Sequence, residues 1–449
     1  MSTKNEVFGY LPDERPPLLG LIFFALQQIV VMFPATVLVA LITGFHVSTT
    51  IFASGLATLG FILITGRQIP LYYGSSFSYI AAIASIMSGE QFALFSLNEK
   101  ISIAQFGIVM SGFVSIIAGY IVNKSGKDKI DKVLPATVTG SIAIIIGLSL
   151  AANAMTNAAS FPEVAQNNPY AGSWAWTIAV ITLLSTILYS VYLKGKLSQL
   201  PILFGLLTGY ITALIIGGIT GIPFVSFDTI QTTGAFNLPV FTFPKPTIAA
   251  LVAIMPIAIA TIPESTAHVY QLDIYVNDLA KKKGVNKKYD IENKLGLNLI
   301  GDGIGDIISG SIGGPAGTNY GENISAMAIS KNFSIHVLIL AAILTMIISC
   351  FTPLINIIYS IPTSVIGGLS IYLFGVIGAQ GITIMIDRKV DMFSSKNLAV
   401  IAVILIVGLG GSFGFEGGMI PMFGIEAPAI ATAAVVGILL NLALSIKEN

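Results

Sequence analysis

Two glutamates and one histidine stand in or beside long apolar runs, where ionisable side chains are unfavourable and usually functional. Glu264 follows a mostly apolar run, and His268 comes four residues after it. This spacing places both side chains on one face of a helix, where a carboxylate and an imidazole can exchange a proton. The alternative is a glutamate and a histidine that only face water near a helix end. We expect a proton-coupling pair.

Glu322 follows a break in another apolar run. The stretch 309–331 reads SGSIGGPAGTNYGENISAMAISK, and its glycines and Pro315 cannot share a regular helix. Non-helical backbone at membrane depth is tolerated only where it is buried in protein or lines a cavity. We therefore expect this broken segment and Glu322 to build a substrate site at mid-bilayer. The simpler alternatives are close helix packing at the glycines and a carboxylate fixed by neighbouring amides.

Further polar side chains occur in the apolar runs nearby. Asp302 and Asp306 are four residues apart and share a helical face. Asp302 could support the site indirectly, and a structural bond to neighbouring backbone is an equal alternative. Gln27 and Gln28 are uncharged amides in the first apolar run, and we expect at least one to face a cavity. No Walker loop, zincin motif or nucleophile elbow is found, which argues against an ATP-driven pump.

The composition indicates a protein dissolved in lipid. Hydrophobic residues make up 54% of the 449, only 10% are charged, and the mean hydropathy is +0.86. The formal net charge of zero argues against nucleic acid as a partner. The single Cys350 excludes an intrachain disulfide and a cysteine metal cluster. The polar first residues, 1–17, do not resemble a cleavable signal peptide.

The apolar runs predict fourteen membrane-spanning segments. Twelve of them are expected at 18–41, 47–66, 101–122, 134–154, 174–193, 200–219, 247–270, 294–312, 334–359, 362–386, 397–409 and 425–446. The third span has extended residues 69–74 before a helix near Ser76, and the tenth is the broken segment described above. A basic amphipathic connector is expected at 123–133. With a cytoplasmic N-terminus, all of the 22 basic residues except Lys100 and Lys245 fall in cytoplasmic segments. This positive-inside bias favours an even number of spans and two cytoplasmic termini.

An internal repeat supports the same count. Residues 73–78 resemble 320–325, and residues 134–140 resemble 361–367, with similar offsets of 247 (320 − 73) and 227 (361 − 134). The halves are then spans 1–7 and 8–14, and the second half is inverted because seven is odd. Inverted repeats with matching broken segments are typical of transporters, whose site lies where the breaks meet. We expect short extended pieces side by side, followed by half-helices with free amides near Phe77 and Gly321.

These motifs resemble the nucleobase/ascorbate transporter (nucleobase:cation symporter-2) family, most closely its bacterial uracil permeases. The resemblance runs from about residue 18 to 446 and is most specific at 314–329, 362–378, 389–391 and Glu264…His268. It implies an all-α polytopic membrane protein with 14 transmembrane segments in a 7+7 inverted repeat, spans 3 and 10 being a short strand plus a half-helix. It also implies a core domain (18–122 and 247–359) that binds substrate and a gate domain (134–219 and 362–446).

The resemblance also implies roles for single residues. Glu264 and Glu322 would hydrogen-bond a pyrimidine, the main-chain amides of Phe77 and Gly321 would bind its carbonyls, and His268 would assist. The expected apolar walls are Ala35, Tyr320 and Phe374; the expected supporting residues are Asp302, Gln28, Asn323 and Ser76; the expected proton-coupling residues are Glu264, His268 and Glu322. No cofactor or metal is expected, and protons are the expected coupling ion.

The expected function is proton-coupled import of uracil across the cytoplasmic membrane by alternating access, often as a homodimer. This sequence departs from the family pattern at Gln28, where histidine is common, at Ser325, where glycine is common, at Ser330, where threonine is usual, and at Phe374, where uracil permeases have tyrosine. Three alternatives stay open: a xanthine or other purine permease, an anion transporter or channel on the same fold, and a membrane-embedded enzyme. The last lacks a recognisable nucleophile or metal set.

Overall fold

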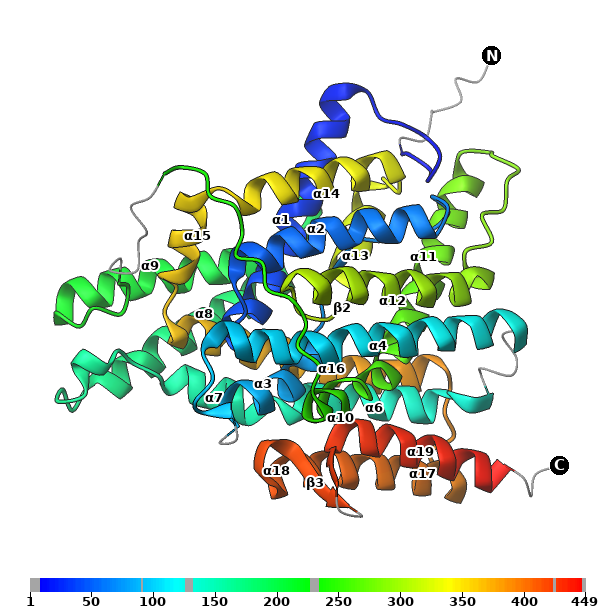
Figure 1. The fold of residues 1–449 in the computed structure, drawn as a ribbon. Helices are drawn as coiled ribbons and strands as arrows, with labels where there is room; N and C mark the ends of the chain where they lie inside the picture. The colour runs from blue at the N-terminus through cyan, green and yellow to red at the C-terminus, as the bar shows by residue number, and fades with distance from the viewer. Residues whose placement is uncertain (1–8, 90–91, 126–131, 227–233, 423–424, 446–449) are drawn as a thin grey trace.

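The computed structural model describes residues 9–89, 92–125, 132–226, 234–422 and 425–445. Its long helices run side by side, and the described chain begins and ends on the same side of the molecule (Figure 1). Among the described residues, nine helical segments are long and apolar enough to cross a membrane. They are α1 (Leu18–Thr43), α2 (Val47–Ile64), α4 (Leu97–Ser125), α6 with α7 (Ala136–Ala159), α8 (Ala171–Tyr192), α9 (Pro201–Thr220), α10 (Ile248–Ile254) with α11 (Ile257–Lys282), α16 (Thr363–Asp387) and the segment Ser395–Gly414, which contains α17 (Ser395–Leu405) and α18 (Gly411–Gly414).

Two short strands pair in the middle of the bundle. β1 (Tyr73–Ser75) pairs antiparallel with β2 (Gly317–Asn319), with Tyr73 opposite Asn319. Each strand leads into short helices, the 3-10 turn η1 (Phe77–Tyr79) and α3 (Ile80–Ser88) after β1, and α13 (Gly321–Ser330) after β2. All six strand residues are buried, so this non-helical backbone is enclosed by protein. The expectation of two extended pieces side by side is confirmed.

The helices pack in two sets. In the first set, α12 (Leu295–Ile312) packs on α4 and α2, and α14 (Ile335–Ser349) packs on α1 and α2. In the second set, α16 packs on α6, α7 and α8, and α17 (Ser395–Leu405) packs on α19 (Ala429–Ser445) and α6. Glycines permit the closest approaches: a Cβ on Gly112 would lie 2.5 Å from the Gly303 carbonyl oxygen, and a Cβ on Gly140 would lie 2.7 Å from that of Gly381.

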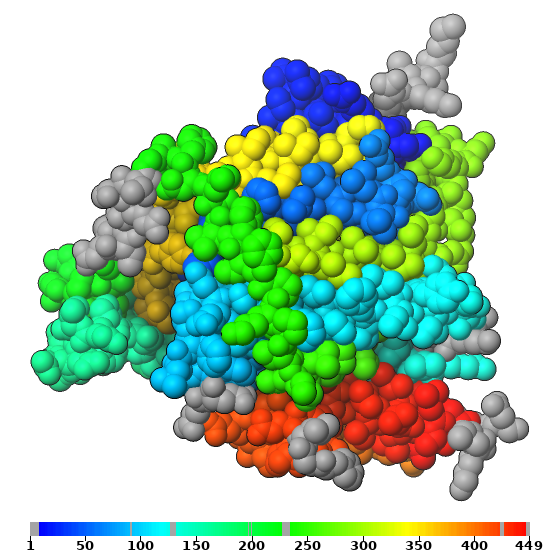
Figure 2. Space-filling view, viewed as in Figure 1, coloured from blue at the N-terminus to red at the C-terminus, as the bar shows by residue number. Residues whose placement is uncertain are grey.

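An extended segment of the chain packs against helices of the first set. Figure 2 shows residues 234–247, in green, crossing the surface of the molecule. Thr49 donates to the carbonyl of Val240 at 2.7 Å, and the Gln105 amide nitrogen donates to the carbonyl of Thr242 at 2.8 Å. The Lys245 amide donates to the carbonyl of Ser102 at 2.8 Å. Side chains of α2 and α4 therefore satisfy the backbone of a segment that has no secondary structure of its own.

Several of the expected span boundaries are wrong. The segment expected at 334–359 is two helices, α14 and α15 (Thr352–Tyr359), because Pro353 stands in the first turn of α15 and cannot continue a helix. The helix expected from 425 begins only at Ala429, because Ile425–Pro428 is strand β4, paired with β3 (Met419–Met422). The helix expected to end at 270 continues to Lys282, since Leu272, Val276 and Leu279 bury one face of the extension.

The fifth segment also differs from its expected form. The structure has α6 (Ala136–Ser149) and α7 (Ala151–Ala159), which meet at Leu150, instead of one helix over 134–154. Most of the connector expected at 123–133 lies outside the described residues. The division into a core and a gate domain, which matches the two packed sets, stays a prediction.

Candidate substrate site

The paired strands place two helix N-termini in the middle of the molecule. Tyr320 is the extended residue before α13, so Gly321 is the first residue of that helix. Ser76 caps η1 by accepting a hydrogen bond from the Ser78 amide at 3.3 Å, and Phe77 is the first residue of the turn. The first amides of a helix have no partner within it. Phe77 and Gly321 thus stand where a main-chain N–H can donate to a ligand.

The two glutamates singled out in the sequence lie near each other. Glu264 on α11 and Glu322 on α13 are close enough for their charges to interact, and the Ser78 hydroxyl lies beside Glu264. Both glutamates keep accessible surface, whereas Pro263 and Asn323, their neighbours in sequence, are buried. The two glutamates are therefore enclosed by the bundle but less tightly packed than their neighbours in sequence.

His268 joins these residues. A Cβ added to Gly321 would lie 2.9 Å from the Nε2 atom of His268, so the ring fits only because residue 321 is a glycine. The ring also lies beside the backbone of Asn319 at the end of β2. The structure thus brings His268 to the start of the half-helix that carries Glu322, and one turn of α11 separates it from Glu264.

Tyr320 forms a fixed, buried wall. Its hydroxyl is 2.9 Å from that of Thr36 and donates to the carbonyl of Ser75 at 3.1 Å. Its ring covers Gly74, where an added Cβ would lie 2.3 Å from the ring carbons. Ala35, also buried, belongs to the same hydrophobic cluster.

Phe374 reaches the site from the second set of helices. Its ring meets the ring of Phe77 edge-on, with the centroids 6.0 Å apart and an interplanar angle of 76°. Phe374 is buried and Phe77 is half-buried. The expected wall residues therefore come from both sets of helices.

Asp302, expected to support the site, contacts the residue that follows Glu264. It accepts hydrogen bonds from the Ser265 hydroxyl at 2.6 Å and from the Asn298 amide at 3.2 Å. The carboxamide oxygen of Asn298 in turn accepts from the side chain of Asn319 at 3.0 Å. This chain of contacts ties α11, α12 and β2 together.

Gln28 and Asn323 form a second buried support. The Asn323 amide nitrogen donates to the Gln28 side-chain oxygen at 2.8 Å and to its carbonyl at 3.0 Å. Because Asn323 follows Glu322, this contact fixes the first turn of α13 against α1.

The sequence does not predict the residue that holds the two strands together. Asp306 accepts from the hydroxyl of Tyr73 at 2.5 Å, from the amide of Gly317 at 2.8 Å and from the hydroxyl of Ser111 at 3.4 Å. The helical spacing places Asp306 beside Asp302 without predicting a partner for it, and Tyr73 enters the sequence analysis only through the repeat. A tyrosine opening the first break and a buried aspartate one turn beyond Asp302 were the available signs.

Comparisons with known proteins agree on the class of protein. Residues 19–417 match the family model Xan_ur_permease, described as a Permease family. The chain is 34% identical over 443 residues to the uracil permease of Bacillus caldolyticus, covering 96% of this chain and 94% of that protein. It is 32% identical over 451 residues to the uracil permease of Bacillus subtilis (strain 168), covering 99% of this chain and 96% of that protein. It is 33% identical over 431 residues to the uracil permease of Escherichia coli (strain K12), covering 96% of this chain and 92% of that protein.

Solved structures share the fold at low sequence identity. SLC26A9 superposes with a TM-score of 0.65 at 13% identity, covering 96% of this chain, which spans 66% of the SLC26A9 chain. The transmembrane domain of the cyanobacterial bicarbonate transporter BicA superposes with a TM-score of 0.57 at 14% identity, covering 96% and 99%. The chain is therefore an all-helical, multi-pass membrane protein of the SLC26/BicA-like fold. It is a transporter, not an enzyme, and it belongs to the Permease family of nucleobase:cation symporter-2 proteins.

Proposed function

We propose that this protein imports uracil together with protons across the cytoplasmic membrane. The observation that carries the proposal is the meeting of Glu264 and Glu322 beside the helix start at Gly321. Uracil presents two N–H donors and two carbonyl acceptors around a flat ring. Carboxylates accept from the donors, and free helix amides donate to the carbonyls.

The apolar parts of the site suit the same ligand. Tyr320 is held by Thr36 and by the Ser75 carbonyl, and Phe374 stacks edge-on against Phe77. A flat ring gains most from such fixed aromatic walls. The names of the similar bacterial permeases point to uracil as well, and the departures at Gln28 and Phe374 bear on how tightly this base is held.

We infer that Glu264, assisted by His268, carries the coupled proton. Two carboxylates in one enclosed site repel each other, and binding one proton relieves that repulsion. Protonation and substrate together would then favour the state in which the two sets of helices rearrange. In this proposal the sets are the core and gate domains of a 7+7 inverted repeat, both termini are cytoplasmic, and the protein works as a homodimer.

An anion transporter on the same fold is the rival of a different class. Such a site needs positive charge, whereas this one presents two carboxylates, Glu322 in the first turn of α13 and Glu264 within α11. A xanthine permease of the same family is the closer rival, and the glutamate at position 322 favours uracil over xanthine in the family resemblance. The membrane-embedded enzyme is excluded by the family.

Radiolabelled uracil uptake into proteoliposomes with an imposed pH gradient, competed with unlabelled xanthine and thymine, tests the proposal. Uptake driven by an acidic outside and competed by uracil more strongly than by xanthine supports it. Uptake that xanthine competes better than uracil would reassign the substrate. Chloride-dependent current without uracil uptake would favour the anion rival.

A further inference from the structure

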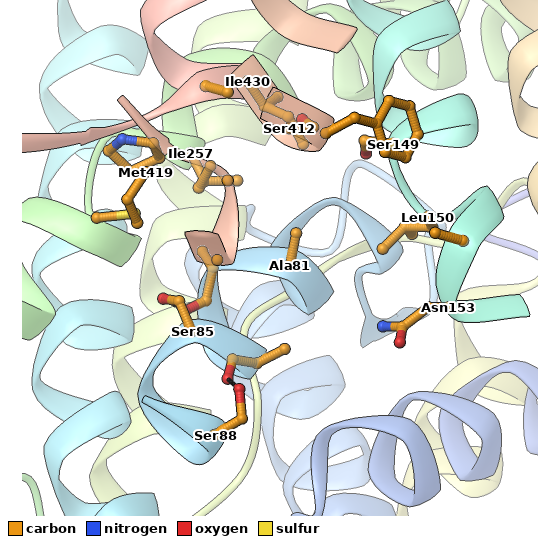
Figure 3. Close-up of a pocket in the computed structure, with 18 residues that line it drawn as sticks. Ala81, Ser85, Ser88, Ser149, Leu150, Asn153, Ile257, Ser412, Met419 and Ile430 are labelled. Carbon is orange, nitrogen blue, oxygen red and sulfur yellow. Dashed lines mark hydrogen bonds between the residues drawn. The ribbon is translucent and has the colours of Figure 1, made fainter. Parts of the chain in front are cut away.

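A cavity separate from the residues above lies between the two sets of helices. Its volume is about 210 Å³. Ala81 and Ser85 of α3 and Ile257 of α11 line one side, and Ser149 and Asn153 near the α6–α7 junction line another (Figure 3). Ser412, Met419 and Ile430, from the α18–hairpin–α19 region, complete the lining.

The lining is neutral and rich in hydrogen-bond acceptors. No charged residue is among the described residues that line the cavity. Ser85 donates its hydroxyl proton to the Ala82 carbonyl at 2.7 Å, and Ser149 and Ser412 likewise donate to carbonyls of their own helices at 3.0 and 2.7 Å. Each hydroxyl oxygen then keeps its lone pairs for a ligand. The Asn153 carboxamide adds a donor and an acceptor, so the cavity suits a neutral molecule with N–H groups.

The cavity lies along the same helix faces as the substrate site. Ser85 is eight residues after Phe77, and Ala81 lies midway between them. Ile257 is seven residues, about two turns, before Glu264 on α11. The cavity therefore lies about two helical turns from Phe77 along α3 and about two turns from Glu264 along α11.

The cavity has a wall that belongs to a compact turn. Gly417 and Gly418 adopt positive φ angles of 59° and 68° in the turn before β3, and this turn contacts α3. A Cβ added to Gly417 would lie 3.3 Å from the Cβ of Ser85. α3 packs on α1 and α4 of the first set, and the turn packs on α18, which contacts α19 of the second set. The cavity would therefore change shape when the sets move.

We propose that this cavity is a second binding site, here called the outer site. It holds one neutral nucleobase before that nucleobase reaches the inner site at Glu264 and Glu322. The proposal rests on the proposed function, which supplies the cargo. The volume is several times the roughly 30 Å³ of one water and lies below the about 300–1,000 Å³ of pockets for drug-sized ligands. A single small ring fits that range.

Cysteine labelling in the purified full-length protein tests the outer site. Asn153→Cys serves as the reporter in a Cys350→Ala background, with Ser88→Cys as a second reporter in case the first fails to fold. A matched control is Val164→Cys, an exposed residue that lines a different surface depression. The rate of reaction with a methanethiosulfonate reagent is measured with increasing uracil, with and without Glu322→Gln, which weakens the inner site.

The outer site predicts that uracil slows labelling of the reporters at least threefold in both backgrounds and leaves Val164→Cys unchanged. Slowing that disappears with Glu322→Gln would overturn the proposal, because it would show that only the inner site is occupied. Labelling of the reporters that uracil does not slow, in a protein that takes up uracil, would also overturn the outer site and leave the proposed function standing. Failure of uptake with every nucleobase would instead overturn the proposed function.

Discussion

The phenolic hydroxyl of Tyr73 donates a 2.5 Å hydrogen bond to Asp306, and the same carboxylate oxygen accepts the amide of Gly317 at 2.8 Å. One buried oxygen therefore fixes the starts of both paired strands. The strands in turn set where the half-helices begin, and so where Phe77, Gly321 and Glu322 lie. The site depends on a residue that does not touch it.

Tyr73→Phe tests this anchor. The change removes one buried hydrogen bond to a carboxyl group, which is typically worth about 1.5–3 kcal/mol. We expect a lower melting temperature in detergent and weaker uracil binding, with Asp306→Ala more severe because it frees Gly317 as well. Tyr192→Phe, at a tyrosine that is 71% exposed, is the control. Unchanged melting and binding in Tyr73→Phe would show that the contact is dispensable.

Gly74→Ala tests the fit of the Tyr320 wall. The new Cβ would stand 2.3 Å from the ring carbons of Tyr320, so the ring must leave its contacts with Thr36 and Ser75. We expect uracil binding to weaken at least tenfold. Gly375→Ala is the matched control because a Cβ there meets no heavy atom within 4 Å. Equal binding by the two variants would contradict the assigned role of the wall.

Much of this arrangement was predictable from the sequence, for a physical reason. Glycines, Pro315 and a polar run inside an apolar chain cannot form a regular lipid-facing helix, so a buried break was expected at Glu322 and, by the repeat, near Phe77. Helical spacing put His268 on the face of Glu264. The partner of Tyr73 was not predictable, because Asp306 is distant in sequence and the pairing depends on how α12 passes under the strands.

The boundaries that failed also have local causes. The hairpin of β3 and β4 consists of two four-residue strands in an apolar sequence, which composition does not separate from the helix that follows. The extension of α11 to Lys282 is amphipathic and leaves the apolar pattern of a membrane span, so a hydropathy reading ends the helix too early. The outer cavity was missed since its lining of serine, alanine and glycine has no distinctive spacing.

A segment before α1 fastens the two helices that carry the glutamates. Tyr10 donates its amide to the Lys331 carbonyl and accepts the Phe333 amide, both at 2.8 Å, just beyond α13. Asp13 accepts from Lys287 at 2.7 Å and from Tyr289 at 2.5 Å, in the connection after α11. Burial raises the pKa of Asp13, but these two hydrogen bonds, a backbone hydrogen bond and the charge of Lys287 together outweigh burial, and the pKa lies below its ordinary value.

Asp13→Asn tests this fastening and its pH dependence. Because the pKa of Asp13 is lowered in the folded protein, its stabilisation is present above the unfolded value of about 3.9 and is lost as pH falls through the folded value. We expect the free energy of unfolding of the variant to be lower than that of wild type at pH 7 by at most about 1 kcal/mol, because the pair is largely exposed. The variant should therefore melt at a lower temperature. The difference in melting temperature between the variant and wild type should disappear as the pH is lowered below about 4. Asp278→Asn, which breaks an exposed ion pair with Lys282 on one helix, should change less.

Glu264→Gln tests proton coupling. The amide cannot carry the proton but keeps the shape of the side chain, so uracil exchange between equal pools should survive in part. Accumulation driven by a pH gradient should fall to the level seen without a gradient. Asp302→Asn is the informative comparison, because it alters a residue that contacts Ser265 without facing the ligand in our proposal. Equal pH-driven accumulation in Glu264→Gln and wild type would remove Glu264 from the coupling step.

The central claim is that Glu264 and Glu322 hold one neutral nucleobase between them. Titration calorimetry of purified protein with uracil, comparing wild type with Glu264→Gln and Glu322→Gln, tests it most directly. Glu322→Gln removes a charge-assisted hydrogen bond of about 1.5–3 kcal/mol, so we predict at least tenfold weaker binding in that variant, and weaker binding in Glu264→Gln, both with intact melting curves. Wild-type affinity for uracil in both variants would contradict the account.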